Sequence, residues 1–324
     1  MKKNKMMRIA SILMVVTLLS TCAISGTFAK YVTKASGEDK ARVAKWGIVV
    51  DVKGNTVFAD KYAAEDEDYL AAGGVYSVEA KVSEEEDAIN KVVAPGTSSA
   101  QVGEDLLSAS VKGTPEVATR YTLVISNWED IVLPKGEYTD YTELKKADDG
   151  TYGYTGKFST DADYAPVKWN FTVTKGEKTV DLLAIAKTML PADAQSVVKG
   201  FSATEAKLIM ANYADALADL LEQQVTSGAA RNAKVEVADD GTITLSMDFD
   251  PNAEMDYTFA LSWEWAFEGP TAMITSKTAG TLFDATKVDQ CDTYLGNVIA
   301  GVVKDANAKT TISASITASA TQID

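Results

Sequence analysis

The sequence predicts a mainly β protein, an antiparallel β-sandwich with a helical insertion at about 181–228. Three observations favour this fold. Segments that alternate between apolar and polar residues, as strands with one buried face do, recur from residue 41 to residue 318. Helical periodicity is concentrated in the middle of the chain. No internal repeat or low-complexity linker divides the sequence, so one sandwich explains the pattern more economically than two domains.

The predicted strands lie between turn signals. Alternation is clearest in 166–174 and in 257–267, where Trp263 and Trp265 share a face and Glu264 points the other way. A carbohydrate site with Glu264 beside these rings is an alternative to a core tryptophan pair, which we favour. The strands are expected at 41–53, 56–59, 75–82, 92–97 (ending in the Pro95–Gly96 turn), 106–112, 118–128, 166–174, 233–237, 242–249, 257–267 and 310–318.

Two further kinds of segment interrupt the strands. Residues 181–190 and 203–224 have helical spacing, and Ser202 with Glu205 resembles a capping box at the start of the second helix. Another helix is expected within 284–303. Residues 134–164 are rich in Tyr, Asp, Gly and Thr, which predicts a long surface excursion or hairpin.

The N-terminal segment predicts export. Three lysines and Arg8 precede an apolar run from Ile9 to Leu19, which is about 11 residues long, whereas a membrane-spanning helix needs roughly 20. We expect cleavage between Ala29 and Lys30; a lipoprotein site at Cys22 is the weaker alternative. The secreted chain would then comprise an arm at 30–40 and one domain at 41–324, with no stable membrane insertion after cleavage.

Composition excludes several functions. The formal net charge of −15 disfavours nucleic acid as a partner. The chain contains no histidine, which excludes a Ser-His-Asp or Cys-His triad and a His-x-x-x-His zinc site. A general base would have to be a carboxylate, lysine or tyrosine. After cleavage Cys291 would be the only cysteine, and we expect it to be buried and structural.

One acidic cluster could bind a metal ion. Asp248, Asp250, Glu254 and Asp256 could gather oxygen atoms around Ca²⁺, although their spacing does not match the EF-hand loop. A solvated acidic turn is the interpretation that we favour. No other cofactor is predicted.

Several short motifs, taken in order, resemble a known family. The signal ending at Ile24–Ala29, with Lys30 and Tyr31 after it, resembles the exported substrates of the SipW-type signal peptidase. Taken together, the motifs are similar to the TasA and camelysin group of Gram-positive bacteria. The remaining motifs are 41–49, 93–97, 113–117, 263–267, 292–296 and the final strand with its end at 321–324. The segments 134–164 and 181–228 lie outside the resemblance.

The resemblance implies a jelly-roll sandwich, secretion and assembly into fibres of an extracellular or biofilm matrix. The partners would be other copies of the chain or related matrix subunits, together with the SipW-type signal peptidase. In such fibres the arm of one subunit, here Lys30, Tyr31, Val32 and Thr33, completes a sheet of the next.

Three other functions remain as alternatives. The chain could be a monomeric cell-surface module that binds carbohydrate or protein through 54–91 and 134–164. A camelysin-like peptidase would need an all-carboxylate site in a chain without histidine. A third alternative is a hydrolase that uses two carboxylates, but no sequence feature favours it. We therefore predict a structural protein without catalytic residues.

Overall fold

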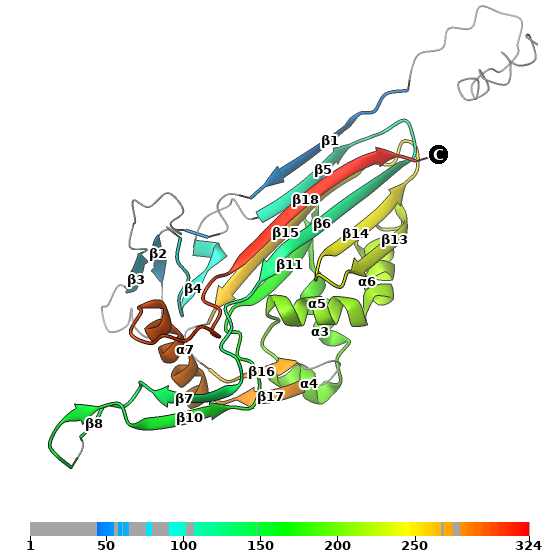
Figure 1. The fold of residues 1–324 in the computed structure, drawn as a ribbon. Helices are drawn as coiled ribbons and strands as arrows, with labels where there is room; N and C mark the ends of the chain where they lie inside the picture. Colours follow the sequence, from blue (N-terminus) through cyan, green and yellow to red (C-terminus); the bar gives the residue numbers. More distant parts are fainter. Residues whose placement is uncertain are drawn as a thin grey trace, which may run out of the picture. The chain divides into compact units, whose positions relative to one another are not determined.

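The computed structural model describes residues 44–54, 58–59, 61–64, 76–79, 91–101, 107–146, 148–266, 269–274 and 279–323. Residues from Lys45 onward form one compact unit. This unit is mainly β, built from antiparallel sheets with a few helices, so the predicted sandwich with a helical insertion is confirmed (Figure 1).

The larger of the two main sheets has the strand order β1-β5-β15-β11-β12, and β4 also pairs with β15. Every pair in it is antiparallel. Its strands are β1 (Ile48–Lys53), β4 (Thr97–Ser98), β5 (Leu107–Gly113), β11 (Lys168–Lys175), β12 (Lys178–Asp181) and β15 (Met255–Trp265).

The second sheet has the order β13-β14-β6-β18 and is also antiparallel. The chain crosses between the two sheets several times, for example from β5 to β6 and from β15 to β18. Its strands are β6 (Thr119–Glu129), β13 (Ala230–Val237), β14 (Ile243–Phe249) and β18 (Ser313–Gln322).

Aromatic side chains hold the sheets together. Tyr121 of β6 stacks on Phe259 of β15 with ring centroids 5.5 Å apart. Trp128 of β6 packs edge-on against Trp169 of β11, also at 5.5 Å. All four side chains are at most 1% exposed. Burying a large apolar side chain contributes about 1.5–3 kcal/mol, so these pairs are a main source of stability.

A β-bulge aims Trp128 into the core. Tyr121, Leu123 and Ile125 alternate inward along β6, and strict alternation would bring Asn127 inward next. Instead Asn127 has φ of 49° and is exposed, while Trp128 is buried. The extra residue therefore returns the tryptophan to the buried face.

Smaller elements extend the sandwich. Residues 134–164 form a hairpin in which β7 pairs with β10, with β8 and β9 paired further along. The smaller elements are β2 (Lys61–Ala64), β3 (Tyr76–Glu79), the 3₁₀ turn η1 (Ser99–Gln101), β7 (Gly136–Asp140), β8 (Lys145–Lys146), β9 (Tyr152–Gly153), β10 (Gly156–Thr160), β16 (Thr271–Ile274), β17 (Ala279–Phe283) and α7 (Ala285–Ile299).

Some predicted boundaries were wrong. We expected a strand at 92–97 that ends in the Pro95–Gly96 turn, but the turn comes first and the short strand β4 follows it. Thr97 explains the order, because its hydroxyl donates to the Ala94 carbonyl at 2.6 Å and closes the turn. The β16–β17 hairpin was not predicted. The last strand, expected at 310–318, lies at 313–322.

The helical insertion joins the edge strand β12 of one sheet to the edge strand β13 of the other. Asp181 caps α3 by accepting hydrogen bonds from the Leu183 and Ala184 amides. Ser202 and Glu205 form the predicted capping box at α5. The insertion comprises α3 (Leu182–Thr188), α4 (Ala192–Val197), α5 (Ala203–Asn212), α6 (Ala214–Leu220) and the π-helical turn η2 (Leu221–Val225).

Two buried carboxylates fix α5 to the sandwich. Asp130, directly after β6, accepts hydrogen bonds from the amides of Ala203 and Thr204 at 2.6 and 2.8 Å. Burial raises the pKa of Asp130, and these hydrogen bonds oppose the rise. This carboxylate therefore satisfies two amides that the start of a helix leaves without partners.

Glu205 connects α5 to two further elements. It is 3% exposed and accepts hydrogen bonds from Lys168 Nζ of β11 at 3.0 Å and from the Ile274 amide of β16 at 2.6 Å. It also accepts the Ser202 amide at 2.8 Å. One side chain thus links a helix, a main sheet and a small hairpin.

A partly buried acid, Asp292, anchors α7. Asp292 accepts hydrogen bonds from the Tyr164 hydroxyl at 2.8 Å and from Trp265 Nε1 at 3.3 Å. Burial raises the pKa of Asp292 to about 7, outweighing both hydrogen bonds. The neighbouring Cys291 is fully buried, and burial raises the pKa of its thiol to about 12.

Replacing Glu205 tests the link that it forms. Glu205→Ala leaves the Lys168 ammonium, whose side chain is 15% exposed, without its carboxylate. We expect the free energy of unfolding to fall by about 3–5 kcal/mol in urea titrations. The control is Glu137→Ala, which breaks an exposed ion pair with Lys157 and should cost less than about 1 kcal/mol. Equal losses in the two variants would show that Glu205 is not a structural link.

The raised pKa of Asp292 predicts a specific pH dependence. The folded protein keeps this proton up to about pH 7, whereas an unfolded aspartate loses it near pH 3.9. Stability relative to Asp292→Asn should therefore be greatest below about pH 4, fall between about pH 4 and pH 7, and level off above pH 7. Between pH 5 and pH 8 the native protein should lose about 3 kcal/mol more than the variant, measured by urea unfolding. Parallel pH profiles would rule out the raised pKa.

Candidate interaction surface

Strand β1 forms an edge of the larger sheet. It pairs with β5 from Ile48 opposite Gly113 to Lys53 opposite Ser108. In the part of the chain that the structure describes, no strand is hydrogen-bonded to its other side. Such an edge can pair with a strand from another chain.

The edge carries exposed apolar side chains. Val49 is 66% exposed, Val52 43% and the preceding Trp46 38%. Proteins usually protect a sheet edge with charged residues or proline. Here the exposed Asp51 and Lys53 lie on the same strand as the exposed valines, so the edge mixes charged and apolar side chains. Exposed apolar side chains at an edge mark a surface for association.

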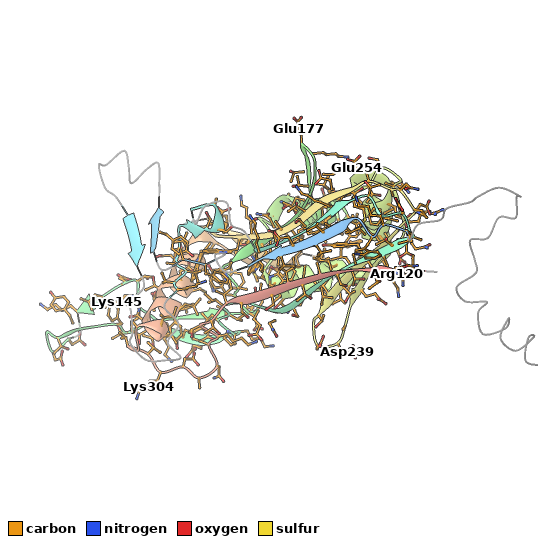
Figure 2. All side chains as sticks on the ribbon, turned by 90° about the horizontal axis from the view of Figure 1, so that it is seen from above. Arg120, Lys145, Glu177, Asp239, Glu254 and Lys304 are labelled. Carbon is orange, nitrogen blue, oxygen red and sulfur yellow. The ribbon has the colours of Figure 1, made fainter. Side chains whose placement is uncertain are left out.

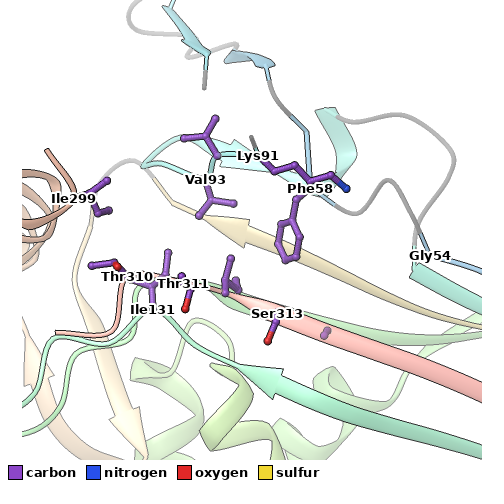
Figure 3. A pocket seen from close by; sticks show the side chains of 12 residues that line it. Gly54, Phe58, Lys91, Val93, Ile131, Ile299, Thr310, Thr311 and Ser313 are labelled. Carbon is purple, nitrogen blue, oxygen red and sulfur yellow. The ribbon is translucent and has the colours of Figure 1, made fainter. Parts of the chain in front are cut away.

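A groove lies where the end of β1 and the start of β18 meet. Its volume is about 440 Å³, and its lining is mostly apolar. Figure 3 shows Phe58 and Val93 on one side of the groove, facing Ile131 and Ser313 on the other. Gly54, directly after β1, also lines it, so a strand extending along β1 would reach the groove. The other lining residues are Lys91, Val92, Ile299, Thr310, Thr311, Ile312 and Ala314.

Backbone contacts fix the chain just before β1. The Lys45 amide donates to a Glu116 carboxylate oxygen at 2.8 Å, and the Glu116 amide donates to the Lys45 carbonyl at 3.1 Å. Gly113 then allows β1 to approach β5: its φ is +137°, and a Cβ atom there would collide with the Gly47 carbonyl. The start of β1 therefore depends on the absence of a side chain at 113.

Sequence reasoning found part of this surface. The run Ile48–Val50 predicts a strand. In a strand, successive side chains point to opposite faces, so Val49 is exposed if Ile48 and Val50 face the core. The groove was missed because Phe58, Val93, Ile131 and Ile312 come from segments far apart in the sequence. No local pattern brings them together.

The residues predicted for cleavage and for strand donation lie outside the described part of the chain. These are Ala29 and Lys30 at the cleavage site, and Lys30, Tyr31, Val32 and Thr33 in the arm. They remain predictions. Among the described residues, no helix combines the length and apolar character needed to span a membrane.

The four acidic residues proposed for calcium have other partners or lie in solvent. Asp248 accepts hydrogen bonds from Arg120 Nε and Nη2 at 2.6 and 2.9 Å, and this arginine holds the pKa of Asp248 below its usual value. Asp250 pairs with Arg231, and Asp256 lies 3.5 Å from Lys112 Nζ. Glu254 is exposed. Within the described residues, no three Cys, Asp or Glu side chains are grouped to hold a metal ion.

The tryptophan strand has the predicted orientation. Trp263 and Trp265 are buried, and Glu264 on the opposite face is exposed. This agrees with a core pair of tryptophans.

Comparisons with protein-family models, with curated proteins and with solved structures found no match for this chain.

Gly113→Ala tests how β1 is held. The new methyl group meets the Gly47 carbonyl, and φ at this position suits only glycine, so we expect a loss of about 2–4 kcal/mol in the free energy of unfolding. Hydrogen exchange should accelerate most at the β1 amides. Gly150→Ala is the control: its φ is also positive, at +85°, but no atom lies within 4 Å, so about 1 kcal/mol should be lost. Unchanged β1 exchange in Gly113→Ala would contradict this account.

Proposed function

We propose that the protein is a secreted structural subunit that self-associates, or co-assembles with related subunits, into extracellular or biofilm matrix fibres. The observation that carries the proposal is the edge at β1 with its exposed valines, which continues through Gly54 into the groove beside the start of β18. The N-terminal arm of one subunit would pair with β1 of the next subunit. The two surfaces differ, so each subunit can both donate and accept.

Main-chain hydrogen bonds would supply much of the affinity. An added strand satisfies the amides and carbonyls along the free edge, and alternate side chains enter neighbouring pockets. Tyr31 and Val32 of the arm are apolar enough to cover Val49 and Val52 or to occupy the groove. A head-to-tail contact that does not close on itself propagates into a filament.

The resemblance to the TasA and camelysin group supports the same proposal. In that setting a SipW-type signal peptidase would cut after Ala29, and the cut would release the arm at Lys30. Cleavage would then be the step that permits assembly outside the cell.

A role without catalysis fits the side chains present. The chain has no histidine, and the Cys291 thiol is buried with its pKa raised to about 12, so it is a poor nucleophile at neutral pH. The carboxylates near residue 250 are largely neutralised by arginine and lysine. Strong negative charge in the whole chain disfavours nucleic acid as a partner.

Removal of the arm tests strand donation. Residues 30–324 should form filaments in negative-stain micrographs and elute as large species from a sizing column. Residues 38–324 should remain monomeric, because the strand to be donated is absent, while retaining the same urea unfolding transition. If both forms stay monomeric across protein concentration, salt and pH, the fibre proposal fails. Filaments from both forms would remove the arm from the mechanism.

A charge on the edge tests the accepting surface. Val49→Lys should raise the protein concentration needed for filaments at least tenfold, because strand addition would bury a lysine. Leu282→Lys on β17 is the control: this leucine is 58% exposed, close to the 66% of Val49, and should assemble normally. The same concentration threshold for Val49→Lys and the native chain would place the contact elsewhere.

A further inference from the structure

The hairpin at 134–164 carries a second surface that the assembly proposal does not use. Strands β7 and β10 pair from Gly136 opposite Thr160 to Asp140 opposite Gly156, and β8 and β9 continue the hairpin. It projects away from the main sheets (Figure 1). Figure 2 shows Lys145 near its end, far from the labelled residues of the sandwich.

A row of aromatic rings runs along this hairpin. From its buried end the order is Phe158, Tyr138, Tyr294 of α7, Tyr141 and Tyr154, with successive ring centroids 5.5, 4.7, 6.1 and 5.1 Å apart. Phe158 and Tyr294 are 6% and 7% exposed, whereas Tyr154 is 46% exposed. The exposed Tyr154 ring therefore contacts the half-buried Tyr141 ring, which in turn contacts the buried Tyr294, and these contacts limit its freedom before any ligand binds.

Tyr152 adds another ring at the outer end. It is 66% exposed, and Lys146 Nζ lies 5.9 Å from its ring centroid. We call the contacting pair Tyr141 and Tyr154, together with Tyr152 two residues before Tyr154, the tyrosine face. Exposed tyrosines at a projecting position are apolar surfaces with a polar tip, a combination enriched at binding sites.

Fixed polar groups flank the tyrosine face. Asp140 accepts hydrogen bonds from the amide and hydroxyl of Thr142 at 2.9 and 2.6 Å, and Asp149 is held in the same way by Thr151. These hydrogen bonds lower the pKa of both aspartates, so both remain ionised acceptors. The exposed ammonium groups of Lys145 and Lys146 supply donors nearby.

We propose that the tyrosine face binds a polysaccharide of neutral sugars. The CH faces of a sugar ring can stack on tyrosine, while its hydroxyls can bond to the aspartate and lysine groups beside the rings. A stable protein interface needs about 800 Å² from each partner, more than a hairpin end with two-residue strands can offer. The net charge of −15 disfavours an anionic polysaccharide. The proposal does not depend on fibre formation.

Affinity electrophoresis of residues 30–324, loaded below the protein concentration at which filaments form, tests the proposal. The gels would contain laminarin or hydroxyethyl cellulose as neutral glucans, or polygalacturonate as the anionic comparison. Both the native chain and Leu282→Ala, an exposed apolar change elsewhere, should be retarded by a neutral glucan. Tyr152→Ala/Tyr154→Ala should bind about tenfold more weakly, and Tyr152→Phe/Tyr154→Phe should stay within about threefold because the rings remain. Urea unfolding checks that the variants fold; Tyr152→Ala alone serves if the double variant does not.

Several results would overturn the proposal. No retardation by either neutral glucan would do so, as would equal retardation of the native chain and the alanine variants. Retardation by polygalacturonate alone, abolished by salt, would identify a charge site instead. Loss of self-association in the double alanine variant, without glucan binding by the native chain, would identify a protein contact. Because glucan binding is measured separately from filament formation, failure of one proposal leaves the other standing.

Discussion

The carboxylates of Asp130 and Glu205 join parts of the chain that are far apart in the sequence, where the apolar face of α5 packs on the core. One satisfies the first amides of α5, and the other joins that helix to Lys168 and to the β16 backbone. Burying such charges is costly unless they are hydrogen-bonded. Here the donors are amides at the start of α5, Lys168 of the larger sheet and the Ile274 amide of β16. The position of the helical insertion, and with it the closure of one side of the sandwich, depends on this arrangement.

That closure makes the two sides of the sandwich unequal. On one side, the chain passes from β12 through five helical segments to β13, and α5 contacts strands of both sheets. On the other side, the edge strands β1 and β18 approach each other without a helix between them among the described residues. The exposed valines and the apolar groove lie on this second side. An interface there can form without disturbing the side that provides much of the structural rigidity.

Local patterns predicted what is locally determined. The Ser202 and Glu205 cap, the buried face of β15 and the helices of the insertion follow from spacings of two to four residues. The second cap of α5 could not be predicted, because Asp130 lies 73 residues before Ala203. The inward turn of Trp128 depends on a bulge at Asn127 that alternation alone does not reveal. The surface at β1 was predicted only as a strand, since its groove is assembled from distant segments.

The hairpin at 134–164 would have a further role if subunits join end to end. Each subunit would contribute one copy of Tyr141, Tyr152 and Tyr154, so a filament would display them at a regular interval. A long glucan could then contact many hairpins at once, and its dissociation would require all of these contacts to break at the same time. Contacts that are individually weak would become collectively persistent through high effective concentration. The length of the filament and of the glucan, rather than the affinity of any one hairpin, would then determine the overall affinity of the matrix for the polysaccharide.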